Sequence, residues 1–76
     1  MYDESKIEDA VLALFGVFEF EGGRVWKNID FNVMDSLHAK GYISKPSGKA
    51  KSVELTADGL TKAKECANRL FNPDKP

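Results

Sequence analysis

The sequence is poor in the features that mark secreted, membrane-spanning and metal-binding proteins. Its single cysteine cannot form a disulfide within the chain, and one histidine with one cysteine cannot assemble a Cys/His metal set. No apolar run approaches the roughly 18 residues that a transmembrane helix needs. The N-terminus is acidic where a signal peptide is basic. These absences predict a cytoplasmic protein that has no membrane contact, metal or cofactor.

The chain is also short. Its 76 residues allow one domain and one core. A chain of this size buries only about 60% of its unfolded surface, which leaves little room for a deep catalytic cleft. The sequence has no glycine-rich phosphate loop, and Ser47 has no partners for a catalytic triad. We therefore expect that the protein is not an enzyme.

Charge is unevenly distributed along the chain. The formal net charge is only −1, but residues 1–23 sum to −5, residues 24–56 to +3 and residues 57–76 to +1. A uniformly basic nucleic-acid binder would not show this pattern, whereas a domain with one basic side would. The central segment therefore holds the candidate cationic surface.

Apolar residues at helical spacing predict three helices. The first covers residues 4–18, with Asp3 as N-cap and an apolar stripe of Ile7, Ala10, Val11, Leu14, Phe15 and Phe18. The second starts at Asp30, ends before Gly41 and has an apolar face of Phe31, Met34 and Leu37. The third starts at Thr56, ends near Phe71 and buries Leu60, Ala63, Ala67, Leu70 and Phe71.

Two short β-like segments, residues 42–44 and 52–55, predict a hairpin that packs against the helices. The turn residues Lys45-Pro46-Ser47-Gly48 fit a type I turn. Residues 24–29 form either a short strand or one helical turn, and Val25, Trp26 and Ile29 are expected inside in both cases. The predicted fold class is α+β, with one domain over residues 1–71 and a disordered tail over residues 72–76.

Several of these residues form a recognisable ordered set. Leu37, Lys40, Gly41, Tyr42 and Ile43, followed by Leu55, Thr56 and Gly59, resemble the winged helix-turn-helix superfamily over about residues 30–71. Most of the chain also resembles a small bacterial family of unknown function, through Trp26-Lys27, Leu37-His38, Lys40-Gly41 and the run Gly48-Lys49-Ala50-Lys51-Ser52-Val53 before Leu55-Thr56. The first resemblance implies a winged helix-turn-helix-like fold, with three main helices and a β-hairpin wing.

The same resemblance implies where a duplex DNA would bind. The helix of residues 30–40 would be the recognition helix, and residues 45–51 would be the wing. Wing lysines would lie along phosphates, and two helix residues would read base edges. The candidate nucleic-acid-binding residues are Arg24, Lys27, Asn32, Ser36, Lys45, Lys49 and Lys51. Ordinary solvated surface is the more common role of such residues.

Two functions from different classes stay open. The first is binding of duplex DNA in transcription regulation. The second is a protein-interaction module without DNA binding, because the recognition helix carries no arginine and the helix before it must be very short. A homodimer through the first or last helix is compatible with both. His38 is expected to make an ordinary hydrogen bond at a helix edge, and Cys66 to be a small core residue.

Overall fold

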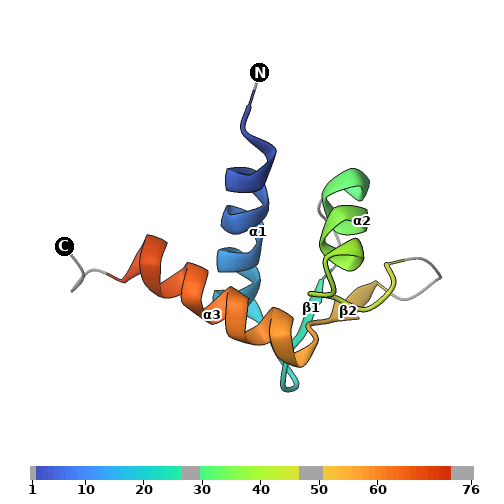
Figure 1. Cartoon of the computed structure of the whole chain (residues 1–76). Coiled ribbons are helices and arrows are strands. Elements are labelled where there is room, and N and C mark those ends of the chain that lie inside the picture. Colours follow the sequence, from blue (N-terminus) through green and yellow to red (C-terminus); the bar gives the residue numbers. More distant parts are fainter. Residues whose placement is uncertain (1, 27–29, 47–50, 73–76) are drawn as a thin grey trace.

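The computed structural model describes residues 2–26, 30–46 and 51–72 of the chain. Its elements follow in the order α1 (Glu4–Phe18), β1 (Arg24–Trp26), α2 (Phe31–Ala39), β2 (Ser52–Glu54) and α3 (Ala57–Phe71). Figure 1 shows α1 and α2 standing side by side, with α3 crossing α1 and the short strands between α2 and the α3 start. The three predicted helices and the α+β class are confirmed.

Each helix starts at the N-cap that the sequence predicts. One Asp3 carboxylate oxygen accepts hydrogen bonds from the amides of Ser5 and Lys6, which have no partner within the helix. Asp30 does the same for the second and third residues of α2. The hydroxyl oxygen of Thr56 accepts from the Gly59 amide at 2.9 Å. Local capping chemistry therefore fixes where all three helices begin.

The segment left open between strand and helical turn contains strand β1. It pairs antiparallel with β2, and Val25 lies opposite Val53. The predicted hairpin partner, residues 42–44, joins the other side of β2 through one bridge, Ile43 to Leu55. The Ser44 amide also donates to the Glu54 carbonyl oxygen at 2.8 Å. The hairpin tip, residues 47–50, lies outside the described residues, and so does Ile29.

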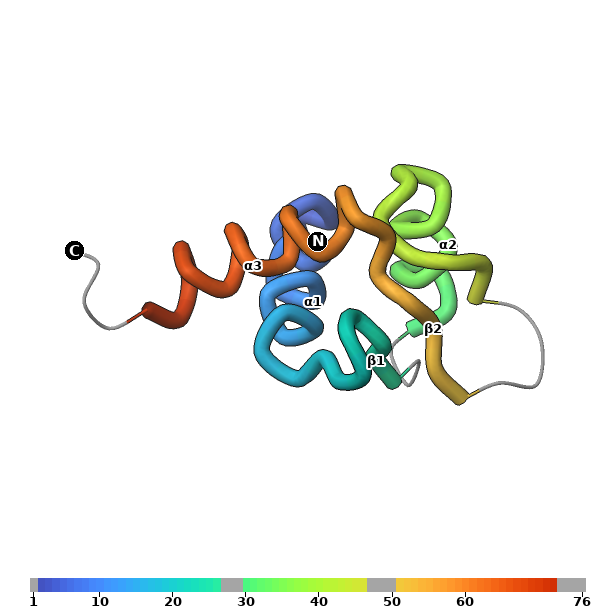
Figure 2. Tube along the Cα trace, turned by 90° about the horizontal axis from the view of Figure 1, so that it is seen from below, coloured from blue at the N-terminus to red at the C-terminus, as the bar shows by residue number. Residues whose placement is uncertain are grey.

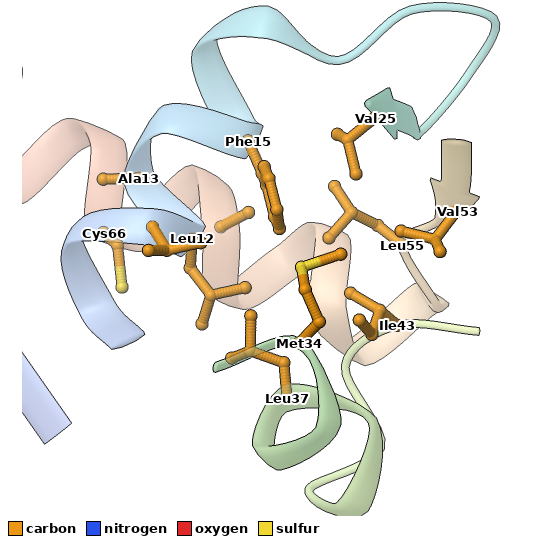
Figure 3. Packing of buried hydrophobic residues seen from close by; sticks show 12 residues of the cluster. Leu12, Ala13, Phe15, Val25, Met34, Leu37, Ile43, Val53, Leu55 and Cys66 are labelled. Atoms are coloured by element: carbon orange, nitrogen blue, oxygen red, sulfur yellow. The ribbon is translucent and has the colours of Figure 1, made fainter. Parts of the chain in front are cut away.

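The core draws on every element (Figure 3). Its side chains converge between α1, α2, α3 and the inner face of the sheet, and the most deeply buried large ones are Leu12, Met34, Leu37, Ile43 and Cys66. Val25 and Val53 close it from the strands. The predicted burial of Met34, Leu37 and Cys66 is confirmed.

A close backbone contact joins the end of the α2 segment to the start of α3. The Thr56 amide donates to the Tyr42 carbonyl oxygen at 3.0 Å, and the Thr56 hydroxyl donates to the Gly41 carbonyl oxygen at 2.6 Å. A Cβ atom on Gly59 would lie 1.8 Å from the Tyr42 oxygen. Gly41 has φ = +82°, as expected for a residue that ends a helix. The residues that follow α2, Gly41 and Tyr42, are therefore in direct contact with Thr56 and Gly59 at the start of α3.

A second close approach sets the crossing of α1 and α3. A Cβ atom on Gly16 would lie 2.7 Å from the Ala63 carbonyl oxygen, so only glycine allows this separation. The Lys64 ammonium reaches back to the Gly16 carbonyl oxygen at 2.8 Å. Because α1 has no basic residue in its own last turn, Lys64 supplies the positive charge that a helix C-terminus favours.

The expected apolar faces are corrected at several positions. Ile7, Leu14 and Phe18 are exposed, because α1 turns the neighbouring face, with Leu12, Ala13 and Gly16, towards the core. That face carries the small residues which the α3 crossing requires. Phe31 is also exposed.

Trp26, expected inside, is 57% exposed. The alternation of the strand places Val25 inward and Trp26 outward, where its ring packs on Phe20 with centroids 5.0 Å apart.

The view in Figure 2 shows the C-terminal half of α3 extending beyond the rest of the molecule. Leu70 and Phe71, predicted to be buried, are half exposed there. Asn72 caps α3, and the other residues of the predicted disordered tail, 73–76, lie outside the described residues. None of the helices in the described part of the chain is long and apolar enough to cross a membrane.

The Gly59 contact yields a stability prediction. Gly-to-Ala changes inside helices are normally stabilising, but a methyl group on Gly59 meets backbone that cannot move freely. We expect Gly59→Ala to lower the free energy of unfolding by about 2 kcal/mol or more, as overpacked sites do. Urea denaturation measures this. The control is Asn68→Ala on the exposed side of α3; equal stabilities for the two variants would contradict the contact.

Candidate functional site

A groove lies between α1 and α2. Its cavity has a volume of about 370 Å³ and is lined by Glu4, Ile7, Glu8, Asp30, Asn32, Val33 and Ser36. Ile7 and Val33 provide apolar walls, whereas three of the lining residues are acids and none is basic. Such a groove combines apolar contact with a negative potential, which attracts cations.

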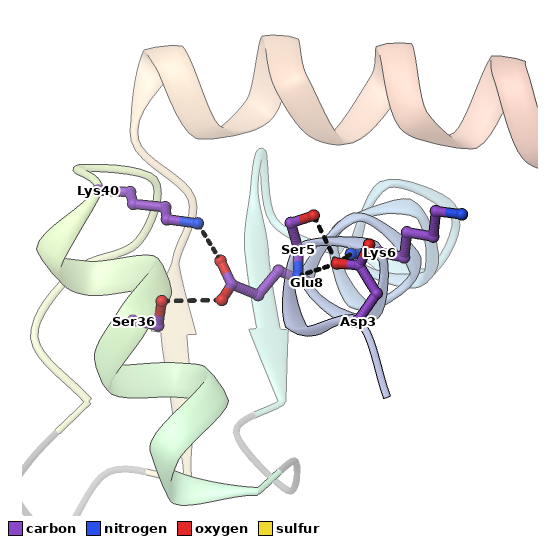
Figure 4. A network of polar contacts seen from close by, with 6 residues as sticks. All are labelled: Asp3, Ser5, Lys6, Glu8, Ser36 and Lys40. Carbon is purple, nitrogen blue, oxygen red and sulfur yellow. Dashed lines mark hydrogen bonds and ion pairs between the residues drawn. The ribbon is translucent and has the colours of Figure 1, made fainter. Parts of the chain in front are cut away.

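Glu8 holds the two walls together (Figure 4). Its side chain projects from α1 towards α2 and the residue is only 8% exposed. One carboxylate oxygen accepts from the Ser36 hydroxyl at 2.9 Å, and the other accepts from the Lys40 ammonium at 2.5 Å. The hydrogen bond from Lys40 to Glu8, assisted by the carboxylate charge, raises the pKa of Lys40. A mostly buried charge is thereby paired and hydrogen-bonded, as burial demands.

Arg24, one of the predicted phosphate-binding cations, is engaged by neighbouring side chains. The Arg24 guanidinium lies 3.0 Å from a Glu54 carboxylate oxygen and 3.4 Å from one of Glu21. It also donates to the Ser52 hydroxyl at 3.1 Å. These contacts link β1 to β2 across the outer face of the sheet and offset the arginine charge locally.

The other candidate nucleic-acid-binding residues that the structure describes fall into two groups. Asn32 is exposed at the groove rim, whereas the Ser36 hydroxyl points into the groove towards Glu8. Lys45 and Lys51 are exposed on either side of residues 47–50. Lys27 and Lys49 lie outside the described residues. Among the described candidates, the groove brings Asn32 and Ser36 together with acids and not with the lysines.

Two single residues behave as the sequence indicates. The ring nitrogen Nδ1 of His38 lies 3.1 Å from the Ile43 carbonyl oxygen, an ordinary hydrogen bond at the edge of α2. Cys66 is buried in the core, and this burial raises the pKa of its thiol. Within the ranges 2–26, 30–46 and 51–72, no cluster of three or more His, Cys, Asp or Glu side chains could hold a metal ion.

The site residues predicted from the sequence do not include Glu8. A signal was present, because Glu8 stands three, four and seven residues before Val11, Leu12 and Phe15. That spacing places a carboxylate on the buried face of α1, where it needs a partner from another element. The groove itself has no sequence signal, because α1 and α2 meet only in the folded chain.

These features define a small α+β domain whose candidate site is an acidic groove between two helices. The chain belongs to a family described as a domain of unknown function (DUF6429), whose model matches residues 3–73. It is 44% identical over 69 residues to the uncharacterised protein y4hR of Sinorhizobium fredii (strain NBRC 101917 / NGR234), covering 91% of this chain and 93% of that protein. No solved structure shows a significant match. The resemblance to a family of unknown function is confirmed.

The Glu8 network predicts a specific loss on neutralisation. Glu8→Gln keeps acceptor and shape but removes the charge that Lys40 binds, so the free energy of unfolding should fall by about 1–2 kcal/mol. Glu4→Gln, on the same helix at an exposed position, is the control and should change it little. A double-mutant cycle with Lys40→Met isolates the coupling. Additive effects of Glu8→Gln and Lys40→Met would contradict the pairing.

The same pair predicts a dependence on alkaline pH. Since the pKa of Lys40 is raised above 10.5 in the folded protein, the pair contributes fully to stability below that pH. Its contribution is lost as the pH rises through the raised pKa. The difference in unfolding free energy between wild type and Glu8→Gln should therefore shrink on the alkaline side of pH 10.5. A difference that stays constant there would show that Lys40 does not bind Glu8.

Proposed function

We propose that this domain is a protein-interaction module that binds a basic, partly apolar segment of another protein in the α1–α2 groove. The observation that carries the proposal is the composition of the groove: apolar walls from Ile7 and Val33 beside acids, with no basic lining residue. Charge complementarity of this kind selects cationic partners and speeds their encounter. The fixed position of α2, tied to α1 through Glu8, makes the groove a preorganised site.

The groove suits a long cationic side chain as the anchor of such a segment. Lysine and arginine place their methylene stems on apolar surface and keep the charged end among polar groups. In the groove, the stem would lie against Ile7 and Val33, and the cation would approach the carboxylates of Glu4 and Asp30. A volume of about 370 Å³ accommodates an inserted side chain and leaves the rest of the segment to contact the rim.

The contacts of the candidate DNA-binding residues favour a protein partner over DNA as the ligand. Arg24 is engaged by two carboxylates, and Ser36 donates to Glu8. Asn32 shares its surroundings with Asp30 and the other groove acids, which repel phosphate. Because affinity for DNA depends largely on neutralising phosphates, α2 is poorly equipped as a recognition helix.

Peptide selection tests the proposal. A random peptide library displayed on phage is selected against the full chain, and the bound peptides are mapped by amide chemical-shift changes. We expect the enriched peptides to combine Lys or Arg with apolar residues. Their binding should change the amide chemical shifts of Val33, Asn32 and other groove residues. The double variant Glu4→Lys/Asn32→Lys should weaken their binding about 10-fold or more, because it places two cations at the groove rim.

The matched control is Glu65→Lys, a charge reversal at an exposed position of α3. It should leave peptide affinity unchanged at moderate salt, where distant surface charges are screened. Enrichment of acidic peptides, or shifts confined to surfaces outside the groove, would refute the groove as the binding site.

Duplex DNA is the second candidate, within a winged helix-turn-helix-like reading of the fold. It is favoured by the element order, in which α2 is followed by the segment whose Ile43 bridges to Leu55 and then by β2. The exposure of Lys45 and Lys51 also favours it. Under this proposal the two lysines contact phosphates, and the fold serves transcription regulation.

Amide NMR titration with random-sequence duplex DNA at low salt tests the second candidate. If the wing binds DNA, shifts appear at residues 43–46 and 51–54 and fade as salt rises. The variant Lys45→Glu/Lys51→Glu removes them, whereas Lys62→Glu on α3 does not. No shifts at low salt would exclude the DNA-binding candidate.

A further inference from the structure

Helix α1 has a second apolar face that the core does not use. Its inner face packs against α2 and α3. Its outer face carries Ile7, Leu14, Val17 and Phe18, which are 38%, 44%, 51% and 70% exposed, and Ala10 is exposed between them. Surface helices normally place polar residues opposite the core face. The outer face of α1 is therefore unusual for a helix that meets only water.

The spacing of these residues is regular. Ile7, Ala10, Leu14 and Val17 are separated by three, four and three residues, which is the a/d spacing of a coiled-coil seam. They form one stripe along α1, which we call the outer seam. Helix–helix packing is the partner geometry that this spacing fits. Leu14 and Val17 do not line the α1–α2 groove, whereas Ile7 does. The outer seam and the proposed peptide site therefore adjoin at Ile7.

We propose that the outer seam is the interface of a homodimer, in which α1 helices of two copies pack antiparallel about a two-fold axis. In this arrangement Ala10 of one copy faces Leu14 of the other, and Ile7 faces Val17. The symmetry axis repeats both contacts, as in any isologous interface. Each small residue meets a large one, so the layers have similar volumes and leave no void.

The seam matches itself better in the antiparallel direction than in the parallel one. A parallel pair would place Ala10 on Ala10, which leaves a gap. It would also bring together the first turns of two helices, where Asp3 and Glu4 lie. An antiparallel pair separates these acids from their counterparts. Because the side-chain sizes along the outer seam complement one another in this direction, a second copy of this chain is the partner that fits it.

Sedimentation equilibrium of the full chain over a range of concentrations tests the dimer. We expect a mass of twice 8.4 kDa at a protein concentration of about 1 mM or below. The variant Leu14→Glu should have a dimer dissociation constant at least about 100-fold larger, because it introduces two buried charges per dimer. The control is Leu70→Glu, because Leu70 has nearly the same exposure, 48%, outside the seam. Circular dichroism confirms that both variants fold.

A charge pair tests the orientation. Ala10→Glu and Leu14→Lys should each weaken the dimer, and the double variant should recover at least about 10-fold over the weaker single variant, because each glutamate then faces a lysine. A monomer at about 1 mM, or equal effects of Leu14→Glu and Leu70→Glu, would overturn the interface. No recovery in the double variant would overturn the antiparallel register.

Discussion

The fold depends on the backbone contact between Gly59 and the Tyr42 carbonyl oxygen. At this point the chain leaving α2 touches the first turn of α3, and no side chain fits between them. Thr56 secures the contact through its amide to Tyr42 and its hydroxyl to Gly41. The same threonine caps α3. One residue thus sets the start of a helix, the end of β2 and the position of α2, on which the groove depends.

Ion pairs across the fold account for the uneven charge along the sequence. The acidic first segment supplies Glu8 and Asp9, and later segments supply the lysine and arginine that bind them: Lys40 at 2.5 Å and Arg69 at 3.1 Å. Surface pairs of this type stabilise a protein only slightly, but Glu8 itself is buried and its contacts orient α2. Ion pairs within the protein therefore neutralise some of the basic side chains that a nucleic-acid interface would need.

The sequence predicts local structure well and surface function poorly. Caps at Asp3, Asp30 and Thr56 act within a few residues, so the helix starts can be read directly from the chain. The faces of α1 cannot, because apolar residues surround most of the helix and the burial of one face is decided by the crossing at Gly16 and Ala63. Trp26 is exposed for a similar reason: the strand's inner position is taken by Val25. Glu8 shows that the site is created by tertiary contacts between distant segments.

Hydrogen exchange at the Thr56 amide tests most directly whether the Tyr42–Gly59 junction holds the fold together. The amide donates to Tyr42 at 3.0 Å, and the neighbouring Leu55 amide donates to Gly23 at 2.8 Å. If the junction opens only when the whole domain unfolds, both amides exchange with the free energy of global unfolding. Exchange of Thr56 through a local opening of much lower free energy, with α1 and α3 still protected, would contradict this account.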